Sequence, residues 1–89
     1  MIPRIVEARY VDSYTIWLRF NDGVEGEVDL KDELWGEIFE PLKDINYFKN
    51  FKLNPFTIEW ENGADFSPEF LYDFKNSGTR KNKLKEHVI

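Results

Sequence analysis

The sequence contains no cysteine, a single histidine and no long apolar run. Without cysteine, the chain can form neither disulfide bonds nor thiolate metal sites. No apolar stretch approaches the roughly 20 residues that a membrane-spanning helix needs. The first residues, Met1-Ile2-Pro3-Arg4, also lack the pattern of a secretory signal. We therefore expect a soluble, cytoplasmic protein with no membrane partner.

Groups that carry out proton transfer and nucleophilic chemistry are equally scarce. The only histidine, His87, lies in a charged C-terminal segment, whereas a general base must be held rigidly beside its nucleophile. The phosphate-binding patterns GxxxxGK[ST] and GxGxxG are both absent. The sequence thus predicts a protein that is not an enzyme, and we assign it no catalytic residue, cofactor or metal.

Aromatic residues, in contrast, are abundant: three Trp, four Tyr and eight Phe among 89 residues. Each ring can bury roughly 150–250 Å², so either the core consists mainly of rings or some rings form a partner surface. Residues 1–74 carry a net charge of −9 and residues 75–89 a net charge of +4. We predict one α+β domain over residues 1–76 and a basic, flexible tail over residues 77–89.

Alternating apolar and polar residues in the first third predict an antiparallel three-strand meander with one solvent-facing side. In its first strand, Val6, Ala8 and Tyr10 are expected to face the core. Opposed residues must share a face, which pairs Phe20 with Val24 around a loop that ends in Gly23. The same register places Arg19 opposite Glu25.

Short helices and a second β-hairpin are expected after the meander. One helical turn over residues 31–35 should end at Gly36, and Pro41 and Asp44 resemble helix starts. A hairpin with a four-residue loop over residues 53–56 follows. Ser67 then caps a C-terminal helix that begins at Pro68 and packs on the sheet.

Three carboxylates, Glu59, Glu61 and Asp65, lie around the Asn62-Gly63 turn. Such a cluster could bind a hard cation or raise the pKa of one carboxyl for acid–base chemistry. The alternative is a solvated rim in which Asp65 bonds to the backbone of its own turn.

Partner binding has two sets of candidate residues. Trp17, Arg19 and Trp35 could anchor a protein partner, since exposed tryptophans often do so. For Trp17, the alternative is a ring covered by long neighbouring side chains. Lys81 and Lys83 in the basic tail could contact phosphates, but no aromatic residue after Phe74 offers a stacking platform. A solubilising tail is the alternative.

Several segments resemble the domain of unknown function 2442 family of small bacterial α+β proteins. The most specific is the run Ile58-x-Trp60-x-Asn62-Gly63-Ala64-Asp65-x-x-Pro68-x-x-Leu71-Tyr72. The pattern around Asp22-Gly23, with Val28-Asp29-Leu30 and Phe39-x-x-Leu42-x-Asp44, belongs to the same resemblance. The motif residues that we interpret as structural are Asp22, Gly23, Trp60, Asn62, Gly63, Asp65, Pro68, Leu71 and Tyr72.

The resemblance points to a genetic setting and a domain arrangement but implies no catalytic reaction. Some longer relatives carry a helix-turn-helix, some lie beside a second small gene in a toxin–antitoxin-like arrangement, and no catalytic residues are established. Together with the missing chemistry, this predicts an interaction module, antitoxin-like or regulatory, with a small protein partner or a second copy. The alternatives are a nucleic-acid-associated protein that uses its tail and a carboxylate-based, cation-dependent enzyme.

Overall fold

The structure, a computed structural model, describes residues 2–76, with side chains described as far as residue 74. It has the predicted α+β fold: a three-stranded sheet, a separate two-stranded hairpin, short helices and a C-terminal helix. The strands are β1 (Ile5–Asp12), β2 (Thr15–Phe20), β3 (Glu25–Asp29), β4 (Lys52–Leu53) and β5 (Ile58–Glu59). The helices are the 3₁₀ helices η1 (Lys31–Glu33) and η2 (Glu37–Lys43), and the α-helices α1 (Ile45–Phe48) and α2 (Pro68–Asn76). The predicted tail, residues 77–89, lies outside the described residues.

Strands β1, β2 and β3 form an antiparallel meander in that order. The predicted register between β2 and β3 is confirmed, because Arg19 lies opposite Glu25 and the Phe20 amide donates to the Val24 carbonyl at 2.8 Å. Gly23 closes the loop with φ = 92°, a conformation that costs glycine little and other residues more. The rule that opposed residues share a face of the sheet was sufficient to predict the register of this hairpin.

The predicted inward face of β1 is wrong at its start. Val6 is exposed and Ile5 is buried, because the pairing steps from Ile5 opposite Phe20 to Glu7 opposite Arg19. Two residues of β1 advance for one residue of β2, so Val6 is the extra residue of a β-bulge. The register then holds from Glu7 to Tyr10 and shifts a second time between Tyr10 and Asp12.

Two further predictions, one about a helix start and one about a hairpin loop, also need correction. Pro41 does not begin a helix but lies inside η2, which starts directly after Gly36. The four-residue hairpin loop spans residues 54–57 rather than 53–56, since Leu53 pairs with Ile58. The Asn54 carboxamide oxygen accepts from two later backbone amides at 2.7 Å each, and this side-chain turn sets the loop one residue later.

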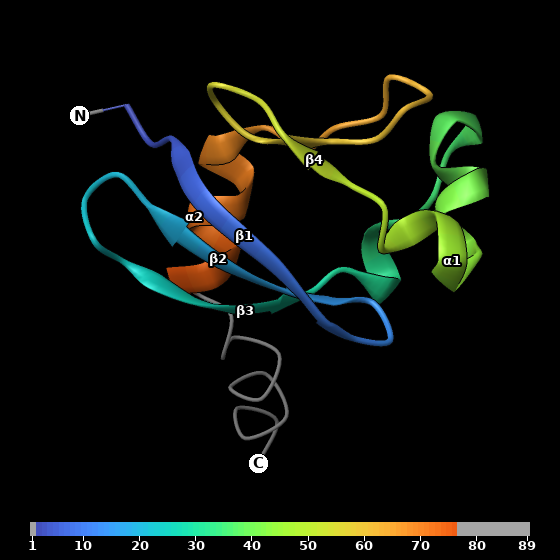
Figure 1. Cartoon of the computed structure of the whole chain (residues 1–89), viewed down its shortest axis with the longest axis horizontal. Helices are drawn as coiled ribbons and strands as arrows, with labels where there is room; N and C mark the ends of the chain where they lie inside the picture. Colours follow the sequence, from blue (N-terminus) through green and yellow to red (C-terminus); the bar gives the residue numbers. More distant parts are fainter. Residues whose placement is uncertain (1, 77–89) are drawn as a thin grey trace, which may run out of the picture.

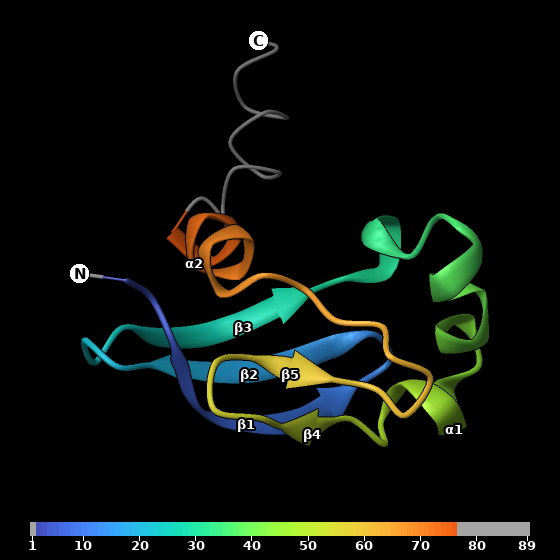
Figure 2. The same cartoon turned by 90° about the horizontal axis from the view of Figure 1, so that it is seen from above.

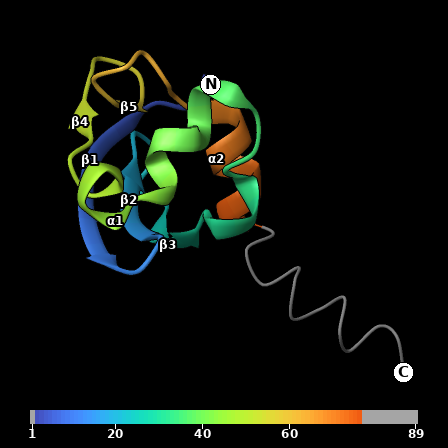
Figure 3. The ribbon, with the colours of Figure 1, turned by 90° about the vertical axis from the view of Figure 1, so that its right-hand side faces the viewer.

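The β4–β5 hairpin crosses above the sheet, and the short helices gather at one end of it (Figure 1). Helix α2 packs against β3, as the view from above shows (Figure 2). Seen end-on, α2 and the hairpin lie on opposite flanks with the short helices between them (Figure 3). Among the residues that the structure describes, no helix has the length and hydropathy to cross a membrane.

Trp60 lies at the centre of the core with 2% of its surface exposed. Its indole N–H donates to the Phe48 carbonyl at 2.7 Å, and its ring contacts those of Phe48, Phe51 and Phe66. The fully buried residues around it come from every layer, and they include Ile16, Leu18, Phe20, Val28, Leu42, Ile58 and Leu71. The rings predicted from composition thus supply much of the core.

Candidate functional site

The first and last residues of the family motif, Asp22 and Tyr72, meet in the structure. The Tyr72 hydroxyl on α2 donates to the Asp22 carboxylate in the β2–β3 loop at 2.6 Å, and the Tyr72 ring packs edge-on against Phe20. This hydrogen bond, assisted by the Val24 amide, holds the pKa of Asp22 below its ordinary value. The contact joins α2 to the sheet.

The central part of the motif builds the turn after β5. The Asn62 carboxamide accepts from the Ala64 amide at 3.1 Å and donates to the Ile38 carbonyl of η2 at 2.9 Å. Gly63 has φ = 92°, so a side chain there would strain the turn. Through its two hydrogen bonds, Asn62 therefore connects the β4–β5 hairpin to the short helix η2.

The last part of the motif starts and docks α2. The Ser67 hydroxyl accepts from the Phe70 amide at 3.0 Å, as an N-cap does. Pro68 is the first helical residue and Leu71 is fully buried. Because each of these motif residues has a folding role, their pattern does not by itself mark a functional site.

Trp17 and Arg19 lie on the outer face of the sheet. The Arg9 guanidinium covers the Trp17 ring at 4.4 Å from its centroid, which leaves the indole half-buried. Arg19 pairs with Glu7 at 2.6 Å rather than with Glu25, its cross-strand neighbour. The exposed Arg19–Glu7 ion pair contributes little to stability, and Arg9 is the side chain that covers the Trp17 ring.

The three carboxylates around the Asn62-Gly63 turn do not form one cluster, although Glu59 and Asp65 lie opposite each other in an antiparallel bridge. Glu59 accepts from the Asn54 side chain at 2.7 Å, Glu61 borders one hollow and Asp65 borders another. Within residues 2–76, no three acidic or histidine side chains form a group that could hold a metal ion. The other predicted binding residues, Lys81 and Lys83, lie outside the described residues.

Trp35, in contrast, is the most exposed aromatic side chain of the described residues, with 73% of its surface accessible. It borders a shallow groove of about 260 Å³ between the η1–η2 turn and the start of α2. We call this the aromatic groove; its lining residues are Glu33, Trp35, Phe39, Asp65, Phe66, Ser67 and Phe70. The two candidate tryptophans therefore differ in exposure: Trp35 is largely open to solvent, whereas Trp17 is partly covered by Arg9.

Three of the residues that line the aromatic groove form a row of stacked rings. Phe39 stacks on Phe66 at 4.9 Å between ring centroids, and Phe66 stacks on Phe70 at 5.7 Å. Phe66 is buried, whereas Phe70 remains 37% exposed. The row continues to Phe74 along α2. The stacked rings of η2, of the loop before α2 and of α2 itself form a continuous apolar surface, and Trp35 lines the same groove.

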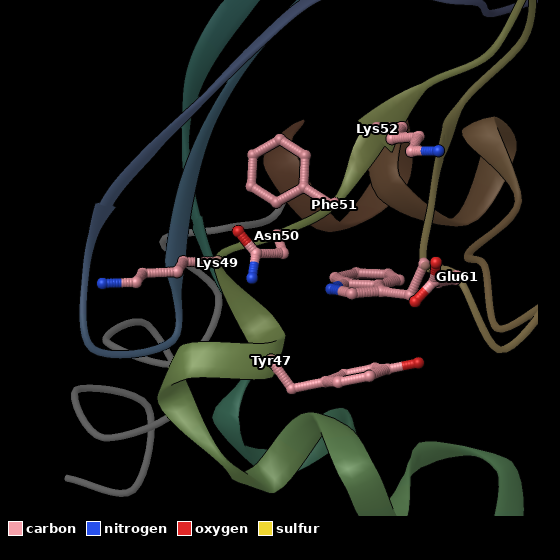
Figure 4. Close-up of a pocket in the computed structure, with 7 residues that line it drawn as sticks. Tyr47, Lys49, Asn50, Phe51, Lys52 and Glu61 are labelled. Atoms are coloured by element: carbon pink, nitrogen blue, oxygen red, sulfur yellow. The ribbon is translucent and has the colours of Figure 1, made fainter.

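A second, larger hollow of about 500 Å³ lies between α1 and the β4–β5 hairpin (Figure 4). Its lining includes Tyr47, Phe51 and the nearly buried Trp60, with several polar residues at its rim. The side chains of Lys49 and Lys52 extend to opposite sides of this hollow (Figure 4). Polar groups that diverge in this way do not form a binding constellation.

Comparison with known families is consistent with the motif. A family model described as protein of unknown function (DUF2442) matches residues 5–77, most of the chain. The chain belongs to the DUF2442 family. No curated protein and no solved structure matches it.

The aromatic groove of this DUF2442 chain was only partly visible in the sequence. Trp35 was among the candidates, but Phe39, Phe66 and Phe70 were not. A signal existed, since Phe66, Phe70 and Phe74 recur at a spacing of four. Phe70 and Phe74 lie along one face of α2, and Phe66, which precedes the helix, stacks on Phe70. What the sequence did not show is that the η1–η2 turn comes beside this face.

Proposed function

We propose that this DUF2442 protein is a non-enzymatic, cytoplasmic interaction module that binds a protein partner through its aromatic groove, as a regulatory or antitoxin-like subunit does. The observation that supports this proposal is the 73% exposure of Trp35 beside a row of stacked rings. Tryptophan is the residue type most enriched at interface hot spots. Exposed apolar surface that groups in one place typically marks an interaction site.

The area still available at Trp35 is large enough to matter for binding. If a tryptophan side chain offers about 250 Å², 73% exposure leaves about 180 Å² to be covered by a partner. At about 25 cal/mol per Å², burial of this ring would contribute about 4.5 kcal/mol before the costs of association. The exposed edge of Phe70 adds to this contribution.

Co-purification of the tagged full chain from the cells that naturally express it tests this proposal. We expect a stable protein partner with the wild-type chain and its loss in a Trp35→Ala/Phe70→Ala variant. Phe56→Ala is the matched control, because Phe56 is also exposed, at 63%, but lies in the β4–β5 loop. A thermal unfolding curve for each variant checks that the fold is retained.

Two results would count against the proposal. The first is recovery of the chain alone at physiological concentration, with neither a partner nor self-association. Alternatively, the Trp35→Ala/Phe70→Ala variant could retain the partner as well as the wild type does. The second result would move the interface elsewhere and leave the aromatic groove without a role.

The nucleic-acid alternative stays a separate prediction that depends on the basic tail. A chain truncated after Asn76 would then lose DNA or RNA binding, and binding by the full chain would weaken steeply with salt. No retardation of either nucleic acid at low salt would remove this alternative. The cation-dependent enzyme would instead require the backbone amides near Asp65 to shift on addition of Mg²⁺, Mn²⁺ or Ca²⁺.

A further inference from the structure

The two segments that form the aromatic groove carry charge of one sign only. Residues 32–40 and 61–73 contain eight acidic residues and no lysine or arginine. Two of these acids, Glu33 and Asp65, line the groove itself. Glu37 and Glu69, both exposed, follow closely along the chain. Basic residues border these segments at Lys31, the first residue of η1, and at Lys43, which pairs with Glu40 at 3.0 Å. The two acids that line the groove form no such ion pair with the residues that the structure describes.

This charge distribution restricts what can occupy the groove. A cluster of carboxylates beside an apolar surface repels phosphates and acidic peptides, and it attracts cationic groups. A nucleic acid or an anionic membrane surface would therefore meet unfavourable charge here. A protein segment with lysine or arginine beside a large apolar side chain would satisfy both the rings and the acids.

We propose that the aromatic groove binds a positively charged segment of a partner protein. One large apolar side chain of this segment fills the groove against Trp35 and Phe70, and its lysine or arginine residues lie beside Glu33 and Asp65. This inference deepens the proposed function and depends on it. It adds the chemistry of the partner: apolar contact supplies most of the affinity, and charge selects among segments with a similar apolar face.

The indole N–H resonances of the full, ¹⁵N-labelled chain give a direct test, since the chain has three tryptophans in distinct environments. We would titrate three synthetic 12-residue peptides with the same leucine and tryptophan positions and with lysine, glutamine or glutamate elsewhere. The lysine peptide should shift the Trp35 indole and bind about tenfold more tightly than the glutamine peptide. The Trp17 indole on the outer sheet face should not move.

A pair of charge variants identifies the carboxylates responsible. Glu33→Gln/Asp65→Asn should reduce the preference for the lysine peptide over the glutamine peptide several-fold, while the glutamine peptide binds as before. Glu25→Gln/Glu27→Gln changes the net charge equally, but on the outer face of β3, and should leave the preference unchanged. Equal effects of both variants would show a diffuse charge effect and overturn the assigned site.

The outcomes separate this inference from the proposed function. If all three peptides bind at Trp35 with equal affinity, the charge inference fails while the groove remains a docking surface. If the lysine peptide leaves the Trp35 indole unshifted at millimolar concentration, the inference is overturned. If the Trp35 resonance of the chain alone shifts on dilution, the occupant is a second copy and the inference is also overturned. The proposed function fails independently when Trp35→Ala/Phe70→Ala retains the native partner.

Discussion

The contrast between Trp60 and Trp35 leads to a paired prediction about stability. Both residues are replaced by phenylalanine, so that the chemical change is identical and only the environment differs. Trp60 is 2% exposed and Trp35 is 73% exposed. The Trp60 indole also donates to the Phe48 carbonyl at 2.7 Å, and a phenylalanine ring cannot replace this donor.

The expected magnitudes follow from these environments. Loss of a buried hydrogen-bond donor costs about 1–3 kcal/mol, and the space left by the smaller ring adds about 1 kcal/mol. We therefore expect Trp60→Phe to lower the free energy of unfolding by about 2–4 kcal/mol. For a domain of this size, this corresponds to a Tm decrease of about 10–25 °C. Trp35→Phe should change the free energy of unfolding by no more than about 0.5 kcal/mol.

Urea denaturation followed by far-ultraviolet circular dichroism measures both values without dependence on tryptophan fluorescence. The urea midpoint of Trp60→Phe should fall clearly, with an unchanged slope, whereas that of Trp35→Phe should coincide with the wild type. The reasoning is refuted if Trp35→Phe destabilises the chain as much as Trp60→Phe does. In that case Trp35 would be part of the core, and the aromatic groove would be covered in solution.

Three further predictions concern the motif and the outer face of the sheet. Gly63→Ala should lower stability by about 1–2 kcal/mol because of its positive φ, and an unchanged Tm would contradict the turn geometry. Tyr72→Phe should raise the pKa of Asp22 toward its ordinary value, as an NMR titration of the carboxyl would show. Because the pKa of Asp22 is lowered in the folded state, this contact stabilises the fold above the ordinary pKa and loses its effect as the pH falls through the folded value. The Tm difference between wild type and Tyr72→Phe should therefore shrink on acidification, and a constant difference would argue against the hydrogen bond. Arg9→Ala should make Trp17 more accessible to acrylamide quenching, with a loss of stability below about 1 kcal/mol; unchanged quenching would mean that another group covers the ring.

The parts of the fold that could be predicted are those determined by local rules. Parity gave the β2–β3 register, and the cap pattern gave the start of α2 at Pro68. The bulge at Val6 was missed because alternation cannot reveal an extra residue when both Ile5 and Val6 are apolar. The hairpin loop was misplaced for a similar reason, since the decisive hydrogen bonds come from the Asn54 side chain rather than from the spacing of apolar residues.

The candidate site depends on contacts between distant segments, which the sequence pattern does not encode directly. Trp17 and Trp35 each follow an apolar residue in the sequence, yet the ring of Trp17 is covered by Arg9 whereas Trp35 is 73% exposed. Trp17 is covered because Arg9 lies opposite it on the neighbouring strand. Trp35 is exposed because it lies in the turn between η1 and η2. The acidic surroundings of Trp35 were visible as composition, but their grouping around Phe39, Phe66 and Phe70 required the fold.

Site-specific photocrosslinking in the cell tests the central claim most directly. A photoreactive phenylalanine derivative would replace Trp35 in one full-length chain and Trp17 in a matched control, and the crosslinked peptides would be sequenced by mass spectrometry. We predict that position 35 captures one defined protein segment rich in lysine or arginine and that position 17 does not. Absence of a crosslink at position 35, or equal capture of the same segments at both positions, would contradict the account.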